Sequence, residues 1–181
     1  MDDCEHKSVR GSITRKLLGE CFEAKGTVCD HCGTQFWDKK DEDAFQVWLR
    51  NKIAEPDFRS QLTINKLLLT RDSQVFIKKL EHDYLVSKEK AVNAIISVYL
   101  IEAWQDENIS NALNSMTIEN ATIDFGPILL CPSLFMRVHS TAKLFDFTVD
   151  ECAYEMVNRM STFLSRDNLK LNPILEVLLT S

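Results

Sequence analysis

Glycine and proline are both scarce in this sequence, at 5 and 4 of 181 residues. Sandwiches and barrels made of many short strands need turn residues at regular intervals, whereas glycine and proline interrupt helices. The shortage therefore argues against a loop-rich β fold and favours long helices. With 45% apolar and 27% charged residues, the composition is that of an ordinary globular chain and not of a disordered one.

Long hydrophobic runs are also missing. The longest apolar stretch, Ala94–Ala103, is interrupted by Ser97 and Glu102 and is far shorter than the ~20 residues that cross a bilayer as a helix. The N-terminal residues MDDCEHKSVR are polar and include acidic side chains where a signal peptide carries basic ones. We therefore expect no membrane span and no signal peptide. The sequence predicts an intracellular protein, cytoplasmic or nuclear, whose six cysteines remain thiols.

An excess of basic charge is absent as well. The net charge is −6 at pH 7, whereas proteins that coat nucleic acid need a clustered basic surface. The sequence also holds no Gly-rich phosphate loop, no nucleophile elbow and no HExxH pair. An enzyme of a known motif type is therefore not expected.

One motif that is present indicates a specific chemistry. Cys29 and Cys32 are separated by two residues and followed by Gly33, in the segment TVCDHCGTQFW. Such a turn aims two thiols at one point, which suits a tetrahedral zinc ion. The glycine permits the left-handed backbone that this kind of turn often needs. The sequence therefore predicts structural zinc (Zn), of which these two thiols supply half of the ligands.

Two further ligands must complete such a site. Cys21 lies eight residues before Cys29, near the end of a predicted helix, and we favour it as the third ligand; a buried core cysteine is the alternative. For the fourth ligand we favour His6 over Cys4, because either residue can fold back along that helix. The side chain of His31, inside the motif, usually points away from the metal. The predicted zinc ligands are Cys29, Cys32, Cys21 and His6.

The other cysteines and histidines suggest a weaker hypothesis, a cysteine-dependent enzyme. Nucleophilic catalysis needs a thiol and a histidine within hydrogen-bond reach in a cleft. The candidates are Cys131, Cys152, His139 and His82. Cys152 and His139 both fall in apolar predicted helices, so a structural role in the core explains them better. A thioredoxin-like redox site is disfavoured because no βαβ pattern surrounds the CxxC motif.

Basic residues near the N terminus support a hypothesis of a different class, nucleic-acid binding. Basic side chains contact phosphates, and an aromatic ring can stack on a base. Acidic residues share this segment, and mixed charge usually indicates only a solvated surface. The predicted RNA- or DNA-binding residues are Lys7, Arg10, Arg15, Lys16 and Trp37.

Apolar residues recur at helical spacing along most of the chain. Residues 117–125 are the least helical, although Thr122 and Ile123 can support a short strand. Thr148 and Glu151 are spaced as a capping box, and no internal repeat is apparent. The predicted helices cover residues 12–26, 41–55, 62–69, 75–85, 87–103, 109–116, 133–144, 148–164 and 173–179.

The predicted fold is all-α: a single compact domain of about eight or nine helices with a small N-terminal zinc-knuckle element. A change of composition at Trp37–Lys40 predicts a zinc-knuckle and helix module over residues 1–40 and a helical domain over 41–181. The predicted function is a non-enzymatic, zinc-stabilised binding or adaptor protein that engages a protein partner. The alternative is a nucleic-acid-binding regulator, such as a transcription cofactor, that uses the basic N-terminal module.

Overall fold

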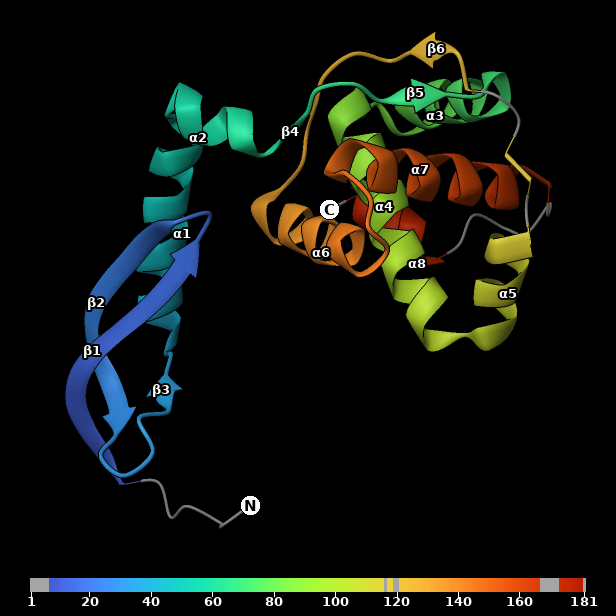
Figure 1. Cartoon of the computed structure of the whole chain (residues 1–181). Coiled ribbons are helices and arrows are strands. Elements are labelled where there is room, and N and C mark those ends of the chain that lie inside the picture. Colours follow the sequence, from blue (N-terminus) through green and yellow to red (C-terminus); the bar gives the residue numbers. More distant parts are fainter. Residues whose placement is uncertain (1–6, 116, 119–120, 167–172, 181) are drawn as a thin grey trace. The chain divides into compact units, whose positions relative to one another are not determined.

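The computed structural model describes residues 7–115, 117–118, 121–166 and 173–180. The chain forms two compact units, Met1–Gln61 and Leu62–Ser181 (Figure 1). The described residues contain eight helices and seven strands, the strands arranged in three small sheets. The predicted all-α class is therefore wrong, and the fold is mixed α/β.

The first unit opens with a long hairpin where the sequence predicted a helix. β1 (Ser8–Leu17) and β2 (Glu20–Cys29) pair antiparallel over all ten residues of each strand. The loop between them consists of Leu18 and Gly19, whose φ angles are 50° and 82°. Two successive left-handed residues are typical of a type I′ turn, whose twist matches that of the strands it connects.

Two features favour strands over a helix in this region. A spacing of four residues, as between Ile13 and Leu17, places side chains on one face of a strand as well as on one face of a helix. Gly26, predicted to end a helix, instead lies opposite Gly11 across the hairpin. A Cβ on Gly26 would lie 2.7 Å from two carbons of Ile13, and one on Gly11 would lie 2.4 Å from Cγ2 of Val28. The glycines therefore leave room for neighbouring apolar side chains.

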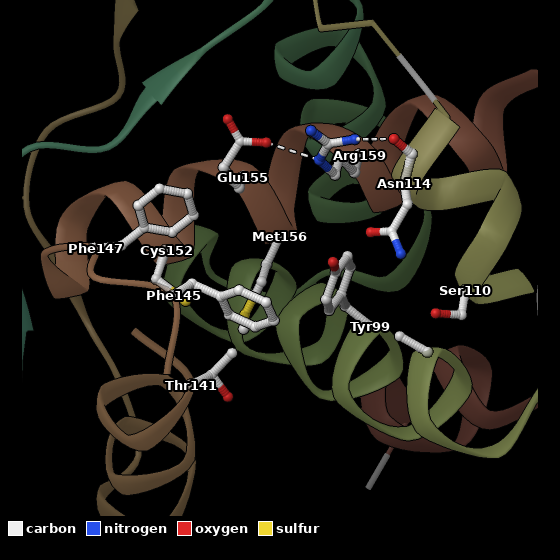
Figure 2. Close-up of a pocket in the computed structure, with 11 residues that line it drawn as sticks. Tyr99, Ser110, Asn114, Thr141, Phe145, Phe147, Cys152, Glu155, Met156 and Arg159 are labelled. Carbon is white, nitrogen blue, oxygen red and sulfur yellow. Dashed lines mark hydrogen bonds and ion pairs between the residues drawn. The ribbon is translucent and has the colours of Figure 1, made fainter. Parts of the chain in front are cut away.

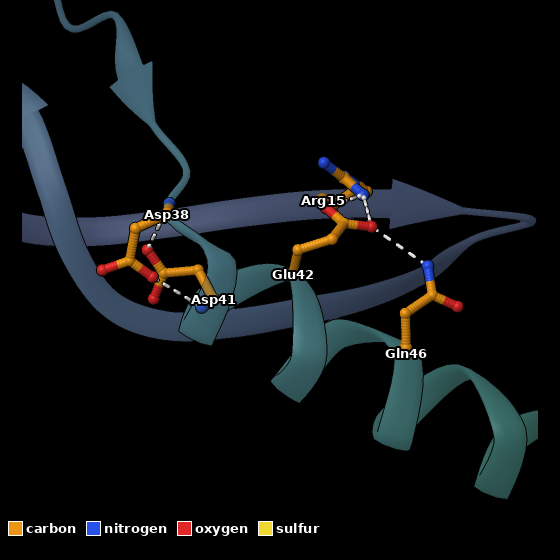
Figure 3. A network of polar contacts seen from close by, with 5 residues as sticks. All are labelled: Arg15, Asp38, Asp41, Glu42 and Gln46. Carbon is orange, nitrogen blue, oxygen red and sulfur yellow. Dashed lines mark hydrogen bonds and ion pairs between the residues drawn. The ribbon is translucent and has the colours of Figure 1, made fainter.

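The rest of the first unit packs an α-helix against this hairpin. β3 (Gln35–Phe36) pairs with β2, and α1 (Lys39–Ala54) and α2 (Pro56–Gln61) follow. The carboxylate of Asp38 accepts the N–H of Asp41 at 2.8 Å, and that of Asp41 accepts the N–H of Asp38 at 3.2 Å (Figure 3). This capping box starts α1. The helix predicted after Asp41 and ending before Pro56 is confirmed.

The second unit is organised by two chain segments that run antiparallel beside each other. β4 (Thr63–Ile64) pairs with β7 (Ile128–Leu129), and β5 (Leu68–Leu69) pairs with β6 (Ile123–Asp124). The helix predicted over residues 62–69 is therefore wrong, whereas the strand predicted at Thr122 and Ile123 is confirmed at Ile123. A short apolar run does not reveal by its period whether it forms a strand or a buried helix.

Six helices complete the second unit, and they confirm the helices predicted after residue 70. Ser87 caps α4 by accepting the N–H of Lys90 at 3.2 Å. Thr148 and Glu151 form the predicted capping box, in which each side chain accepts the other residue's N–H. The helices are α3 (Arg71–Tyr84), α4 (Lys88–Gln105), α5 (Glu107–Ser115), α6 (Pro132–Leu144), α7 (Val149–Arg166) and α8 (Pro173–Thr180).

The structure reveals an internal repeat that is not apparent in the sequence. The strand segment, α3 and α4 form one copy, and the second strand segment, α6 and α7 form another, offset by 61 residues. Each copy has an N-capped helix, a left-handed residue, a second N-cap and a helix of 18 residues. The paired landmarks are the N-caps Thr70 and Cys131, the left-handed residues Leu85 and Asp146, and the second N-caps Ser87 and Thr148.

Two asparagine side chains interlock the copies reciprocally. Asn158 on α7 accepts the N–H of Thr70 and donates to the carbonyl of Leu68, both at 2.9 Å. Asn93 on α4 accepts the N–H of Cys131 and donates to the carbonyl of Leu129, again both at 2.9 Å. Each long helix therefore binds the strand end and the helix start of the other copy.

Candidate functional site

A pocket of about 420 Å³ opens in the second unit between α4, α5, α7 and the corner that joins α6 to α7 (Figure 2). This volume lies within the ~300–1,000 Å³ typical of ligand sites. Figure 2 shows the side chains of Tyr99, Phe145 and Met156 converging on the same space. Met156 is buried and Tyr99 is half-buried. The interior of the pocket is therefore largely apolar.

An arginine fixes one wall of this pocket. Nε of Arg159 lies 2.7 Å from Oε2 of Glu155, one turn earlier on α7. Its Nη1 donates to the carbonyl of Leu113 at 2.6 Å and to that of Asn114 at 3.4 Å. A cation at these carbonyls of the last turn of α5 is favoured by the helix dipole. Arg159 therefore joins α5 to α7, and the ion pair adds a polar edge to an apolar space.

The rim of the pocket exposes large apolar side chains. Phe145 is 63% exposed and Phe147 47%, and their ring centroids lie 6.4 Å apart. Leu144, next to them, is 72% exposed. Between the two rings, Asp146 has a left-handed φ of 57°. Contiguous exposed apolar groups beside a pocket are typical of an interaction surface and are costly to leave in water.

The cysteines and histidines of the enzyme hypothesis have separate structural roles. Cys152 lines the pocket but is only 3% exposed, and burial, with the charge of Glu155, raises its pKa to about 11. Cys131 is the N-cap of α6, and His139 stacks on Phe135 with ring centroids 6.1 Å apart. A thiol with so high a pKa is protonated at neutral pH and is a poor nucleophile. The hypothesis of a cysteine enzyme stays a prediction.

The predicted zinc ligands fall at different places on the hairpin. Cys29 ends β2 and Cys32 lies in the turn before β3, whereas Cys21 is exposed near the other end of β2. Eight residues of extended strand separate Cys21 from Cys29, which is roughly 25 Å at the usual rise. His6 lies outside the described residues. No group of three His, Cys, Asp or Glu side chains suited to a metal occurs among the residues that the structure describes.

The predicted nucleic-acid-binding residues are divided between two faces of the hairpin. Arg10 and Lys16 are exposed on one face of β1, and Lys7 is exposed just before it. The guanidinium of Arg15 instead lies 4.1 Å above the Trp37 ring and pairs with Glu42 at 3.1 Å (Figure 3). The second face packs within the unit, so these five residues do not form one surface. Nucleic-acid binding stays a prediction.

Comparison with known proteins does not assign this chain to a family. No protein-family model, no curated protein and no solved structure matches the chain. Among the helices of the described residues, none is both long enough and apolar enough to cross a membrane.

No pattern in the sequence indicates the pocket. Its lining comes from residues as far apart as Tyr99 and Arg159, and no local pattern connects them. One signal was available: the segment Phe145–Phe147 places two aromatic side chains beside a helix start. Such residues at a corner are either buried by another element or left exposed to a partner.

Proposed function

We propose that the protein is an adaptor that binds a short amphipathic helix of a partner protein in the pocket at the α6–α7 corner. One observation carries this proposal: in the other repeat, the chain itself packs such a helix against α4, the repeat counterpart of α7. That helix is α8. The repeat thus pairs one long helix that packs against another helix with one that lines a pocket beside exposed aromatic rings.

The packing of α8 indicates what the pocket would hold. α8 lies against α4 and buries Leu175 and Leu179, which are 0% and 2% exposed. α8 also lies near the end of α3. The pKa of Tyr84, on α3, is raised by burial and, to a smaller extent, by the negative charge of Glu176, on α8. Tyr84 is the repeat counterpart of Phe145, 61 residues later. An apolar helix with leucines at i and i+4 therefore packs on α4, the repeat counterpart of the helix α7 that lines the pocket.

Differences between the corners indicate the chemistry of the partner. In the repeat, Glu155 and Arg159 replace Ala94 and Val98, which are buried. The partner helix must then present a polar edge to this ion pair beside its apolar side chains. Residues 144–155 contain four acidic residues and no basic ones. Complementary charge favours a helix that carries lysine or arginine next to its leucines.

A labelled peptide tests this proposal. The probe has the sequence of residues 173–180 with two lysines added at each end, and fluorescence anisotropy measures its affinity for the full chain. We expect saturable binding that is weakened at least ~10-fold by the double substitution Phe145→Ser and Phe147→Ser, because exposed aromatic anchors dominate such interfaces. Both rings are exposed, so the variant should fold normally.

The control is Leu85→Ser. Leu85 is 92% exposed and lies at the repeat counterpart of Asp146. It is an exposed apolar residue like Phe145 and Phe147, but it does not line the pocket. A peptide with its leucines redistributed around the helix should bind no better than background. Equal affinity of wild type and the double variant, or no binding at millimolar peptide, would contradict the proposal.

A further inference from the structure

We propose that the β1–β2 hairpin of the first unit binds the phosphate backbone of a nucleic acid through the face that it turns away from α1. This inference is independent of the peptide-binding pocket, which belongs to the second unit. We call the surface the outer face of the hairpin. Its residues are Ser8, Arg10, Ser12, Thr14, Lys16, Cys21, Glu23, Lys25, Thr27 and Cys29.

The register of the hairpin sorts its side chains onto two faces. Successive side chains of a strand point to opposite faces, and directly paired residues share a face. Phe22 contacts Phe45 and Trp48 on α1 and therefore marks the inner face. The large apolar side chains of the two strands all fall on the inner face: Val9, Ile13, Leu17, Phe22 and Val28. The outer face is thus left to polar residues and two cysteines.

The outer face carries three basic side chains and one acidic one. Arg10, Lys16 and Lys25 are exposed. Within the part of the chain that the structure describes, none of the three forms an ion pair. Glu23 is the single carboxylate of this face. The outer face therefore presents an excess of positive charge to the solvent, although the whole chain is acidic.

The inner side of the hairpin holds the ion pairs instead. Lys52 on α1 pairs with Glu20 at 2.9 Å and with Glu55 at 3.1 Å. Glu20 lies between Lys16 and Lys25 in the sequence, yet it falls on the inner face, opposite Leu17. The alternation of the strands thus separates charges that are mixed along the sequence, and Lys52 neutralises one of the carboxylates.

The edge of the sheet adds backbone donors beside these cations. β1 is an edge strand, because the order of the sheet is β1-β2-β3. The N–H of Thr14 points away from β2, since it donates to Oε1 of Gln35 at 2.7 Å. The alternation of an antiparallel pair directs the N–H groups of Arg10, Ser12 and Lys16 the same way. Basic side chains, hydroxyl groups and backbone N–H groups are the usual donors to phosphate oxygens.

The spacing of the three cations suits a duplex. Arg10 and Lys16 are six residues apart on β1, which is about 20 Å at the usual rise. Lys25 lies between them, opposite Ser12 on β2 (Figure 1). Duplex DNA carries about 12 phosphates along the same length. A two-stranded ribbon is also narrow enough to enter the major groove of DNA.

Fluorescence anisotropy with labelled duplexes of about 20 base pairs, one of DNA and one of RNA, tests the outer face on the full chain. Three phosphate contacts predict an affinity that falls about 40-fold between ~50 and ~200 mM salt. The triple substitution Arg10→Gln, Lys16→Gln and Lys25→Gln should weaken binding at least ~10-fold and remove most of this salt dependence. The order of the two affinities identifies the kind of duplex that supplies the phosphates.

The matched control removes three exposed positive charges from the second unit: Lys78→Gln, Lys79→Gln and Lys143→Gln. This variant should bind the duplexes like wild type. A gain of affinity provides a second test. Glu23→Gln removes the carboxylate of the outer face and should strengthen binding at least ~2-fold. Asp43→Asn, at an exposed position of α1, should leave the affinity unchanged.

Three results would overturn the proposal. They are equal duplex affinity of wild type and the outer-face variant, an equally large loss in the matched control, and competition by polyglutamate as strong as by DNA, which would assign the face to an acidic protein. Circular dichroism reports whether each variant is folded, and Glu23→Gln decides the question if the triple variant is not. Peptide binding by the second unit should be the same in all variants, so failure of either proposal is recognised separately.

Discussion

At the scale of single residues, Cys152 shows how burial changes the chemistry of a side chain. Its thiol lines the pocket beside Met156 yet is almost inaccessible. Burial disfavours the thiolate, and the charge of Glu155 disfavours it further, so the pKa rises from 9.0 to about 11. Cys131, at the start of α6, is exposed. The chain thus contains an internal pair for comparing thiol reactivity.

We predict that iodoacetamide modifies the buried Cys152 much more slowly than the exposed Cys131 at pH 7.5. The thiolate is the reactive form, and raising the pKa of the Cys152 thiol from 9.0 to about 11 lowers its thiolate fraction about 100-fold. Mass spectrometry of each cysteine peptide measures both rates. The rate at Cys152 should keep rising until about pH 11, and equal rates at pH 7.5 would show that the thiol is not buried.

The same pKa gives a stability prediction. Between pH 9 and 11 the folded state keeps the Cys152 proton while the unfolded chain loses it. The free energy of unfolding should therefore fall as pH rises through this range, by at most about 1.4 kcal/mol per pH unit, and should not depend on this group below pH 9. Urea titrations at each pH measure it, and Cys152→Ala should remove this part of the slope.

At the scale of elements, the hairpin of the first unit depends on close packing over two glycines. Its core is aromatic: Phe22 lies 5.5 Å from Phe45 and 5.7 Å from Trp48 between ring centroids. Phe22 lies on β2, so its position depends on the pairing of β2 with β1 and on the side chains that pack on the hairpin. Gly26 allows Ile13 to cover the backbone at that point. The packing leaves no space for a methyl group.

We predict that Gly26→Ala lowers the free energy of unfolding of the first unit by about 1–3 kcal/mol, the usual cost of overpacking. The added Cβ would lie 2.7 Å from Ile13. Fluorescence in a Trp104→Phe background leaves Trp37 and Trp48 as reporters of the first unit. Ser12→Ala, on the exposed face of β1, is the control and should change stability by less than about 0.5 kcal/mol. An unchanged midpoint for Gly26→Ala would contradict this packing.

At the scale of the whole molecule, the repeat of the second unit is maintained by polar contacts between its copies. Asn158 is 0% exposed, and its side chain satisfies a backbone donor and a backbone acceptor of the other copy. Asn93 does the same in the opposite direction. Apolar helix faces can shift along each other with little loss of contact. A side-chain amide forms both hydrogen bonds only where the backbone N–H and the carbonyl of the other copy lie next to it. The two asparagines therefore fix the register of the copies.

We predict that Asn158→Leu lowers the free energy of unfolding by about 2–4 kcal/mol. The substitution leaves the N–H of Thr70, a residue that is 8% exposed, and the carbonyl of Leu68 without their side-chain partner, and each buried unsatisfied group costs about 1–3 kcal/mol. Urea unfolding followed by circular dichroism measures the change. Asn111→Leu, at an exposed position of α5, is the control. Equal stability of the two variants would show that the amide contributes no specific contact.

Local signals determined most of the helices. Ser87 and the pair Thr148 and Glu151 mark helix starts by chemistry that acts within one turn, and apolar stripes behind them continue for several turns. Such features are visible in sequence because every interacting residue lies within four positions. The loop at Leu18 and Gly19 was missed because only one of its residues is glycine and the flanking spacing suits a helix equally well.

Long-range pairing decided the strands, the repeat and the pocket. The segments around Ile64 and Ile128 become strands only because each supplies the other's hydrogen bonds, and no short sequence window contains both. The repeat is hidden because counterparts such as Tyr84 and Phe145 keep their places in the backbone but differ in chemistry. The pocket results from that difference. The amino-acid order by itself determined where most helices start and stop. The tertiary structure decided which surfaces are covered and which remain open, because burial depends on residues that meet only after folding.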